Sequence, residues 1–155
     1  MRGYGGDDII QGGFGNDLLD GGDGDDDLYG MIGDDKIYGG AGDDDIFADQ
    51  KNIKGYGSIM FGDDIVFAGD GDDVIYGGIG DDLLYGEDGD DTIYGHAGDD
   101  IIYGGPGEDT ITDEDGWDTI FGGDGCDDIY VYGGGDVVWL GDCSVENGGK
   151  IVVGD

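Results

Sequence analysis

The residues with most potential for chemistry in this chain are carboxylates that recur in pairs at a fixed spacing. In GDGDDVIYGGIGDDLLYG, residues 69–86, the pair Asp72–Asp73 is followed nine residues later by Asp81–Asp82. Carboxylates this close repel one another unless a cation lies between them. The chain has 40 acidic residues against five Lys and Arg, and its formal net charge is −35. The pattern therefore predicts either an unfolded chain or sites for a cation that the sequence does not encode.

The paired carboxylates belong to a nine-residue repeat, Gly-Gly-x-Gly-x-Asp-x-aliphatic-x. Five units occupy residues 3–47 and nine more occupy residues 59–139. In every unit position 4 is Gly, position 6 is Asp and position 8 is Ile, Leu or Val, which indicates a repeat architecture. The position-6 aspartates are the candidate metal ligands: Asp8, Asp17, Asp26, Asp35, Asp44, Asp64, Asp73, Asp82, Asp91, Asp100, Asp109, Asp118, Asp127 and Asp136.

Each column of the repeat has a physical interpretation. Glycine at position 4 suits a turn with positive φ, and positions 7 to 9 alternate outward, inward and outward as a short strand does. One buried aliphatic side chain contributes about 1.5–3 kcal/mol, whereas ordering each of nine residues costs about 1–2 kcal/mol. The apolar core is thus too thin, and a cation must supply cohesion. Oxygen ligands from aspartates and turn carbonyls suit Ca²⁺ better than Mg²⁺ or zinc.

These units resemble the nonapeptide repeats of the RTX (repeats-in-toxin) family of calcium-binding proteins. The resemblance implies an all-β fold, a right-handed parallel β-roll or β-solenoid with two nonapeptide units per coil. It also implies that each Ca²⁺ lies between turns stacked on the same side, for example between Asp73 and Asp91. Counted within the two blocks, three such pairs and seven such pairs predict about ten ions.

The chain divides into four segments on this repeat. They are a first β-roll block at 3–47, an insertion loop or distorted coil at 48–58, a second block at 59–139 and a C-terminal cap or tail at 140–155. The insertion shifts the register by eleven residues and is interpreted as a surface loop, or alternatively as a docking feature. The first unit after it lacks its leading glycines, so we expect a weaker ion site there. Most position-5 residues are acidic, and we expect them to form a solvated rim with a few secondary ligands.

The position-9 column and a pair of cysteines predict contacts between coils. Position 9 is aromatic in eleven of the fourteen units, which predicts outward ladders that stabilise the strands or present a face to a partner or glycan. Cys126 and Cys143 lie seventeen residues apart, close to one coil of eighteen, and we predict a disulfide that clamps the C-terminal end.

The sequence argues against catalysis and against polyanionic partners. His96 is the single histidine, no catalytic motif is present, and the repeat explains the paired carboxylates as ligands. The charge of −35 disfavours nucleic acid and anionic membrane surfaces, and no stretch reaches the roughly 18 apolar residues of a membrane span. The N-terminus has no apolar segment typical of a signal peptide.

Two functional hypotheses remain. The leading one is a structural and secretion module of an exported protein that folds on binding Ca²⁺ outside the cell. Resemblance to the family implies export in the unfolded state by type I secretion. The alternative is a Ca²⁺-stabilised extracellular filament or surface-layer protein, assembled end to end or face to face. Both hypotheses place the chain outside the cell.

Overall fold

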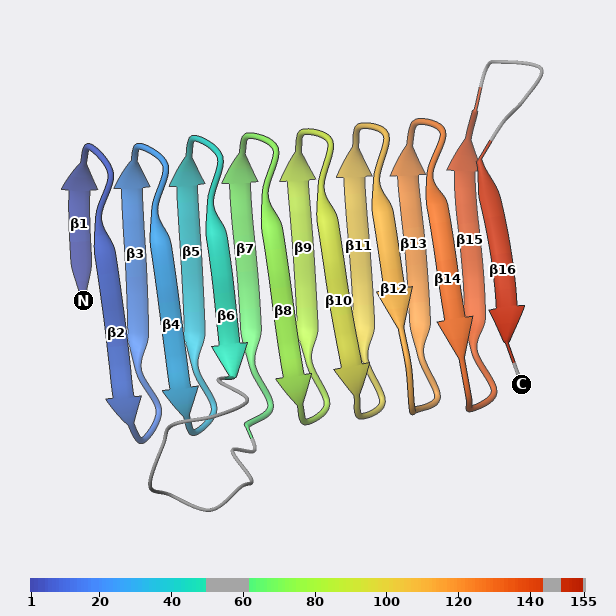
Figure 1. The fold of residues 1–155 in the computed structure, drawn as a ribbon, viewed down its shortest axis with the longest axis horizontal. Helices are drawn as coiled ribbons and strands as arrows, with labels where there is room; N and C mark the ends of the chain where they lie inside the picture. The colour runs from blue at the N-terminus through green and yellow to red at the C-terminus, as the bar shows by residue number, and fades with distance from the viewer. Residues whose placement is uncertain (50–61, 144–148, 155) are drawn as a thin grey trace.

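The computed structural model describes residues 1–49, 62–143 and 149–154 and consists of two parallel sheets (Figure 1). The first sheet contains, in order, β1 (Arg2–Gly5), β3 (Leu18–Asp23), β5 (Lys36–Ala41), β7 (Ile65–Asp70), β9 (Leu83–Asp88), β11 (Ile101–Pro106), β13 (Thr119–Asp124) and β15 (Val137–Asp142). The second contains β2 (Ile9–Phe14), β4 (Asp27–Ile32), β6 (Asp45–Asp49), β8 (Val74–Ile79), β10 (Thr92–Ala97), β12 (Thr110–Asp113), β14 (Asp128–Tyr132) and β16 (Lys150–Gly154).

The chain alternates between the sheets, so that each strand pairs with the strand two places later in the sequence (Figure 1). Partner residues are generally eighteen positions apart, as in the parallel pair Thr92–Thr110. One coil therefore holds two nonapeptide units and places one strand in each sheet. This confirms the predicted all-β parallel solenoid. No helix capable of crossing a bilayer occurs in the described ranges.

The strands are longer than the three residues per unit that the repeat suggested. β8 begins with the position-7 to position-9 residues Val74, Ile75 and Tyr76 and continues through the first three positions of the next unit, to Ile79. Only positions 4 to 6 remain for the turn. Position 4 has positive φ in twelve of the fourteen units, for example 152° at Gly80, where an L side chain would be strained.

The predicted core is confirmed. Position-8 side chains from both sheets meet in one apolar cluster, and Val138 packs against it partly buried. The fully or nearly fully buried position-8 residues are Ile10, Leu19, Leu28, Ile37, Ile46, Val66, Ile75, Leu84, Ile93, Ile102, Ile111, Ile120 and Ile129. Their alternation with outward residues explains why one aliphatic column suffices to define both inner faces.

Aromatic side chains at position 9 stack along the outer surface of each sheet. Ring centroids of successive members lie 4.5 to 5.3 Å apart, with interplanar angles of 3° to 11°. One ladder is Tyr38–Phe67–Tyr85–Tyr103–Phe121–Trp139 and the other is Tyr29–Phe47–Tyr76–Tyr94. These contacts join neighbouring coils, as the strand-stabilising interpretation expects.

The last coil before the insertion and the first coil after it stack directly on each other. β7 pairs with β5 through Lys36–Ile65, and β8 pairs with β6 through Asp45–Val74, at a separation of 29 residues rather than eighteen. The two repeat blocks are therefore continuous in space. Residues 50–61, which hold most of the predicted insertion, lie outside the described residues, and its loop and docking interpretations stay predictions.

Candidate metal centre

The position-6 aspartates form two files, one along each side of the solenoid. In each file the backbone N–H of one aspartate donates to Oδ1 of the aspartate in the next turn, at 2.6 to 3.3 Å. The Asp8 file contains Asp8, Asp26, Asp44, Asp73, Asp91, Asp109 and Asp127. The Asp17 file contains Asp17, Asp35, Asp64, Asp82, Asp100, Asp118 and Asp136. All fourteen candidate ligands are thus brought together in two rows.

Both files run through the insertion without a break. The N–H of Asp35 donates to Asp64 Oδ1, and the N–H of Asp44 donates to Asp73 Oδ1, both at 2.6 Å and across 29 residues. Seven aspartates in each file leave six gaps, and the two files together have twelve. The count of ten pairs assumed separate blocks and omitted these two gaps.

The second carboxylate oxygen has no hydrogen-bond partner along most of both files. Oδ2 is buried and unsatisfied in Asp17, Asp26, Asp35, Asp44, Asp64, Asp73, Asp82, Asp91, Asp100, Asp109, Asp118 and Asp127. A buried polar atom without a partner is costly and rare in folded proteins. Twelve such Oδ2 atoms at equivalent positions of the repeat indicate that a bound group that is not part of the protein lies beside them.

Burial without compensation raises the pKa of these carboxyls. Desolvation raises the pKa of Asp82 to about 9, and neighbouring aspartates add to the shift, while the N–H of Asp64 opposes it. Desolvation likewise raises the pKa of Asp64, Asp73 and Asp100 to about 7. Without a cation the folded chain must therefore bind protons at neutral pH.

The unpartnered oxygens face spaces that other oxygens also line. A Cβ on Gly77 would lie 2.6 Å from Asp82 Oδ2 and 3.0 Å from the carbonyl oxygen of Gly95, one coil further on. Glycine at position 1 leaves this space open. Carboxylate and carbonyl oxygens are the donors that Ca²⁺ prefers, and the files contain neither His nor Cys. The donor set fits a calcium ion.

Position-5 side chains have a structural role that the repeat did not reveal. Oδ1 of Asp72 accepts from the N–H of Asp90, and Oδ1 of Asp81 accepts from the N–H of Asp99, each at 2.9 Å. The direction is opposite to that of the inner files, because here the later turn donates to the earlier side chain. Asn16 accepts in the same way from Asp34. The predicted solvated rim is therefore also an exposed ladder of hydrogen bonds between coils.

Two inward carboxylates were missed altogether. Asp113 occupies position 1 of its unit and is 0 % exposed. Asp49 ends β6, accepts from the N–H of Ile79 at 3.2 Å, and leaves Oδ1 unpartnered. The available signal for Asp113 was a charged residue in a column that is Gly, Ala or Val in the other described units.

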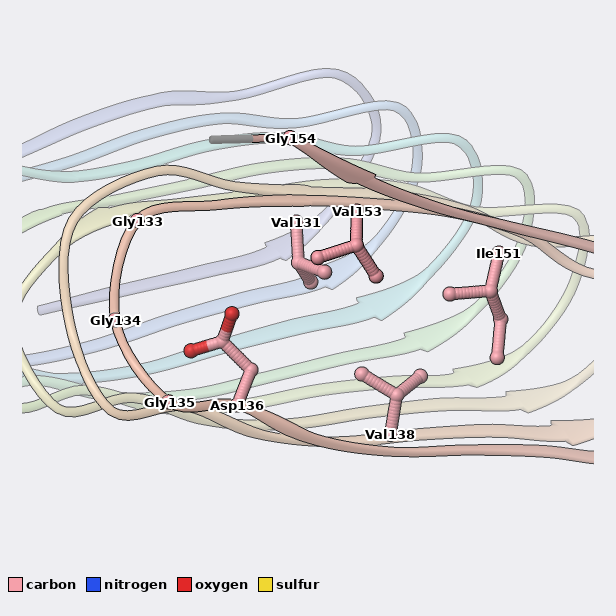
Figure 2. Close-up of a pocket in the computed structure, with 9 residues that line it drawn as sticks. All are labelled: Val131, Gly133, Gly134, Gly135, Asp136, Val138, Ile151, Val153 and Gly154. Atoms are coloured by element: carbon pink, nitrogen blue, oxygen red, sulfur yellow. The ribbon is translucent and has the colours of Figure 1, made fainter.

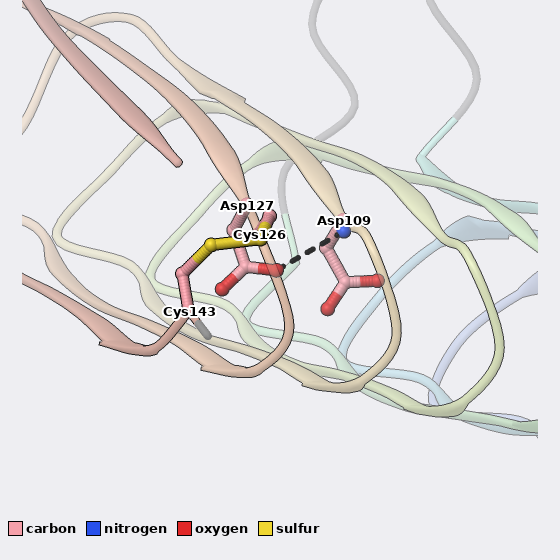
Figure 3. The surroundings of a disulfide bond; sticks show 4 residues. All are labelled: Asp109, Cys126, Asp127 and Cys143. Atoms are coloured by element: carbon pink, nitrogen blue, oxygen red, sulfur yellow. Dashed lines mark hydrogen bonds between the residues drawn. A yellow bond between two sulfur atoms is a disulfide. The ribbon is translucent and has the colours of Figure 1, made fainter. Parts of the chain in front are cut away.

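The C-terminal coil carries the predicted disulfide. Cys126 and Cys143 are bonded, with a Cα–Cα distance of 4.8 Å (Figure 3). Cys126 takes position 5 directly before Asp127, whose Oδ1 accepts from the N–H of Asp109 at 3.1 Å. At position 5 of this coil, the disulfide thus takes the place of the exposed hydrogen-bond ladder that other coils form.

A cavity of about 380 Å³ lies at the C-terminal end of the solenoid, between residues of β14, β15 and β16 and the turn after β14 (Figure 2). Its lining is mostly glycine and valine, with the carboxylate of Asp136 at one side. His96, the single histidine, lies 3.9 Å from Glu114 through Nδ1 and Oε2. His96 is not among the residues that line the cavity.

The fold and the two files define a parallel β-solenoid with buried carboxylates in its turns. The family model of the RTX calcium-binding nonapeptide repeat matches residues 2–37, 20–50, 60–93, 76–111 and 112–142. The chain belongs to this family, which is a structural calcium-binding module. A comparison with curated proteins gave no match.

Proposed function

We propose that this chain is a module of an exported protein that folds when Ca²⁺ binds in the gaps of the two aspartate files. The observation that carries the proposal is the set of twelve buried, unpartnered Oδ2 atoms. The position-6 residues Asp8 to Asp136 are the proposed ligands, each shared by the two gaps beside it except at the file ends. Backbone carbonyls such as Gly95 O complete the donor set.

The energetics explain why the ions control folding. The core is built mainly from one aliphatic column. Without cations, the folded chain must either protonate its buried carboxylates or keep them buried with their charge, and both cost free energy. An ion that binds only the folded state stabilises it by about 2.7 kcal/mol when free Ca²⁺ exceeds Kd a hundredfold. Twelve ions would bring about 24 positive charges against the net −35, which removes most of the repulsion.

The proposed location follows from the supply of Ca²⁺. Modules of this kind bind in the range of extracellular calcium, so the chain stays unfolded before export and folds outside the cell. Type I secretion and the extracellular site are supported by family membership, since RTX repeats are typical of exported proteins.

Circular dichroism of the full chain tests this function. We expect a strand spectrum in millimolar Ca²⁺, an unfolded spectrum in EDTA at pH 7.5, and recovery when Ca²⁺ is restored. Mg²⁺ at the same concentration is the matched control and should not restore the strands, because it demands tighter octahedral geometry. Equal folding with and without EDTA contradicts the proposal. Sedimentation of the same samples shows whether Ca²⁺ also drives self-association.

A further inference from the structure

Asp113 lies where the repeat otherwise has a small apolar residue. It ends β12, its side chain faces the interior, and it is 0 % exposed. Asp113 and Asp118 stand at the two ends of one turn, and Asp100 occupies the equivalent of Asp118 in the preceding turn on that side. A third carboxylate therefore enters the gap between Asp100 and Asp118.

The oxygens of this group converge on one space. A Cβ on Gly95 would lie 2.7 Å from Asp100 Oδ2 and 2.7 and 2.8 Å from the two oxygens of Asp113. At Gly77 the corresponding neighbour is a backbone carbonyl, Gly95 O. At Gly95 the two oxygens of the Asp113 carboxylate are therefore closer to this space than any backbone carbonyl.

The spacing suits a single hard cation. One oxygen from each of Asp100, Asp113 and Asp118 lies within 4.8 Å of the others, and this is the one such group of three found among the described residues. Ca²⁺ holds its oxygens at about 2.3–2.6 Å, so ligands on opposite sides of it are up to roughly 5 Å apart. All three carboxylates can therefore contact the same ion.

Nothing within the described protein balances the charge of this group. Asp113 Oδ1 accepts from the N–H of Glu114 at 2.9 Å, while its Oδ2 is buried without a partner. The ion pairs present in the described ranges, Arg2–Asp20 and His96–Glu114, do not include Asp113. Desolvation raises the pKa of Asp113 to about 8, and Asp100 and Asp118 raise it further.

We propose that Asp100, Asp113 and Asp118 form a three-carboxylate cation site that binds a hard cation more tightly than the two-carboxylate gaps. The proposal rests on the proposed function, because Asp100 and Asp118 are also members of the Asp17 file. A third anionic ligand increases the affinity for Ca²⁺, and it favours trivalent cations still more because the Coulomb attraction grows with the charge.

Terbium in the presence of excess Ca²⁺ tests this site while the other gaps keep the chain folded. Trp117 directly precedes Asp118 and can sensitise Tb³⁺ emission. The background variant Trp139→Phe leaves Trp117 as the sole indole and retains a ring to stack on Phe121. We expect emission to saturate after one equivalent of Tb³⁺, and D113N to require about tenfold more Tb³⁺.

Two further variants separate the explanations. D113G restores the residue of most other units and should weaken Tb³⁺ binding as D113N does. E114Q removes a neighbouring exposed charge and should bind Tb³⁺ as the background does. Unchanged binding in D113N overturns the inference, because Asp113 would then act as a neutral group. Failure of both Asp113 variants to fold in saturating Ca²⁺ also overturns it, because Asp113 would then serve the fold as a whole.

The two proposals fail in different ways. If the chain keeps its strand spectrum in EDTA, the proposed function is wrong whatever Asp113 does. If folding requires Ca²⁺ but the first equivalent of Tb³⁺ shows no preference for this site, only the three-carboxylate inference is wrong.

Discussion

Replacing Asp82 by Asn removes one charge from two gaps at once, because Asp82 lies in the middle of its file. Its Oδ1 accepts from the N–H of Asp64, and its own N–H donates to Oδ1 of Asp100, both at 2.8 Å. Asp17 begins the same file and adjoins a single gap, toward Asp35. The structure therefore predicts unequal effects of the same chemical change at two positions.

The expected magnitude is a difference in bound calcium. The native chain should hold twelve ions, one for each gap. D82N should hold ten and D17N eleven, because Asn keeps an oxygen for the backbone N–H but loses the anionic partner. The matched control D81N, in the exposed ladder, should still hold twelve, since Asn16 already accepts a hydrogen bond at that position.

Ion content is a better measure than stability, because the effect on stability changes sign with conditions. With Ca²⁺ present, D82N loses the contribution of two ions. In chelator, burial raises the pKa of Asp82 to about 9. Folding at pH 7.5 must then protonate a group of ordinary pKa near 3.8, at about 5 kcal/mol. Asn avoids this cost and should stabilise the calcium-free chain.

Equilibrium dialysis against buffered Ca²⁺, followed by atomic emission, measures the content. Equal losses in D82N and D17N would refute the sharing of each aspartate between two gaps. A native content of ten would show that the gaps Asp35–Asp64 and Asp44–Asp73 do not bind. A loss in D81N equal to that in D82N would show that ion binding is not specific to the inner files.

Three further predictions follow from pKa shifts, the disulfide and the core. Burial raises the pKa of the inward carboxyls in the folded chain. The stability that their protonation gives the fold is therefore fully present below the unfolded pKa near 3.8 and is lost as pH rises through about 6 to 9. In EDTA, circular dichroism should show strands forming as pH falls from 8 to 4, and a spectrum that does not change with pH contradicts this prediction. C126S should lower stability by about 3 kcal/mol for its 17-residue loop, with faster amide exchange in β16, and unchanged exchange would count against the clamp. I93A empties a site that is 0 % exposed and should cost about 2–5 kcal/mol in thermal unfolding with Ca²⁺, whereas the outward control T92A should cost far less.

The repeat predicted most of the architecture because each column corresponds to one backbone environment. Position 8 faces inward in every coil, as Ile75 and Ile93 do, and their pairing at eighteen residues follows from two units per coil. The position-6 files were predictable for the same reason. Once the strands are in register, equal positions must stack along the axis.

Other features depend on contacts that the repeat does not encode. Eleven extra residues are not a multiple of nine, so continuity through the insertion appears only in pairs such as Lys36–Ile65. Position 1 is usually glycine, which has no side chain to indicate a direction. The inward orientation of Asp113 therefore becomes visible only when β12 is placed beside β14.

The sharing of each aspartate between two gaps makes calcium binding cooperative on the proposed function. A folded turn positions one carboxylate of the next gap, and the ion in that gap in turn fixes the following turn through oxygens such as Asp91 Oδ2 and Gly104 O. The single aliphatic column cannot hold a coil alone, so coils gain and lose their ions together. The exposed ladder and the aromatic stacks keep neighbouring coils in register. Folding should therefore depend on Ca²⁺ concentration more steeply than binding at one independent site allows.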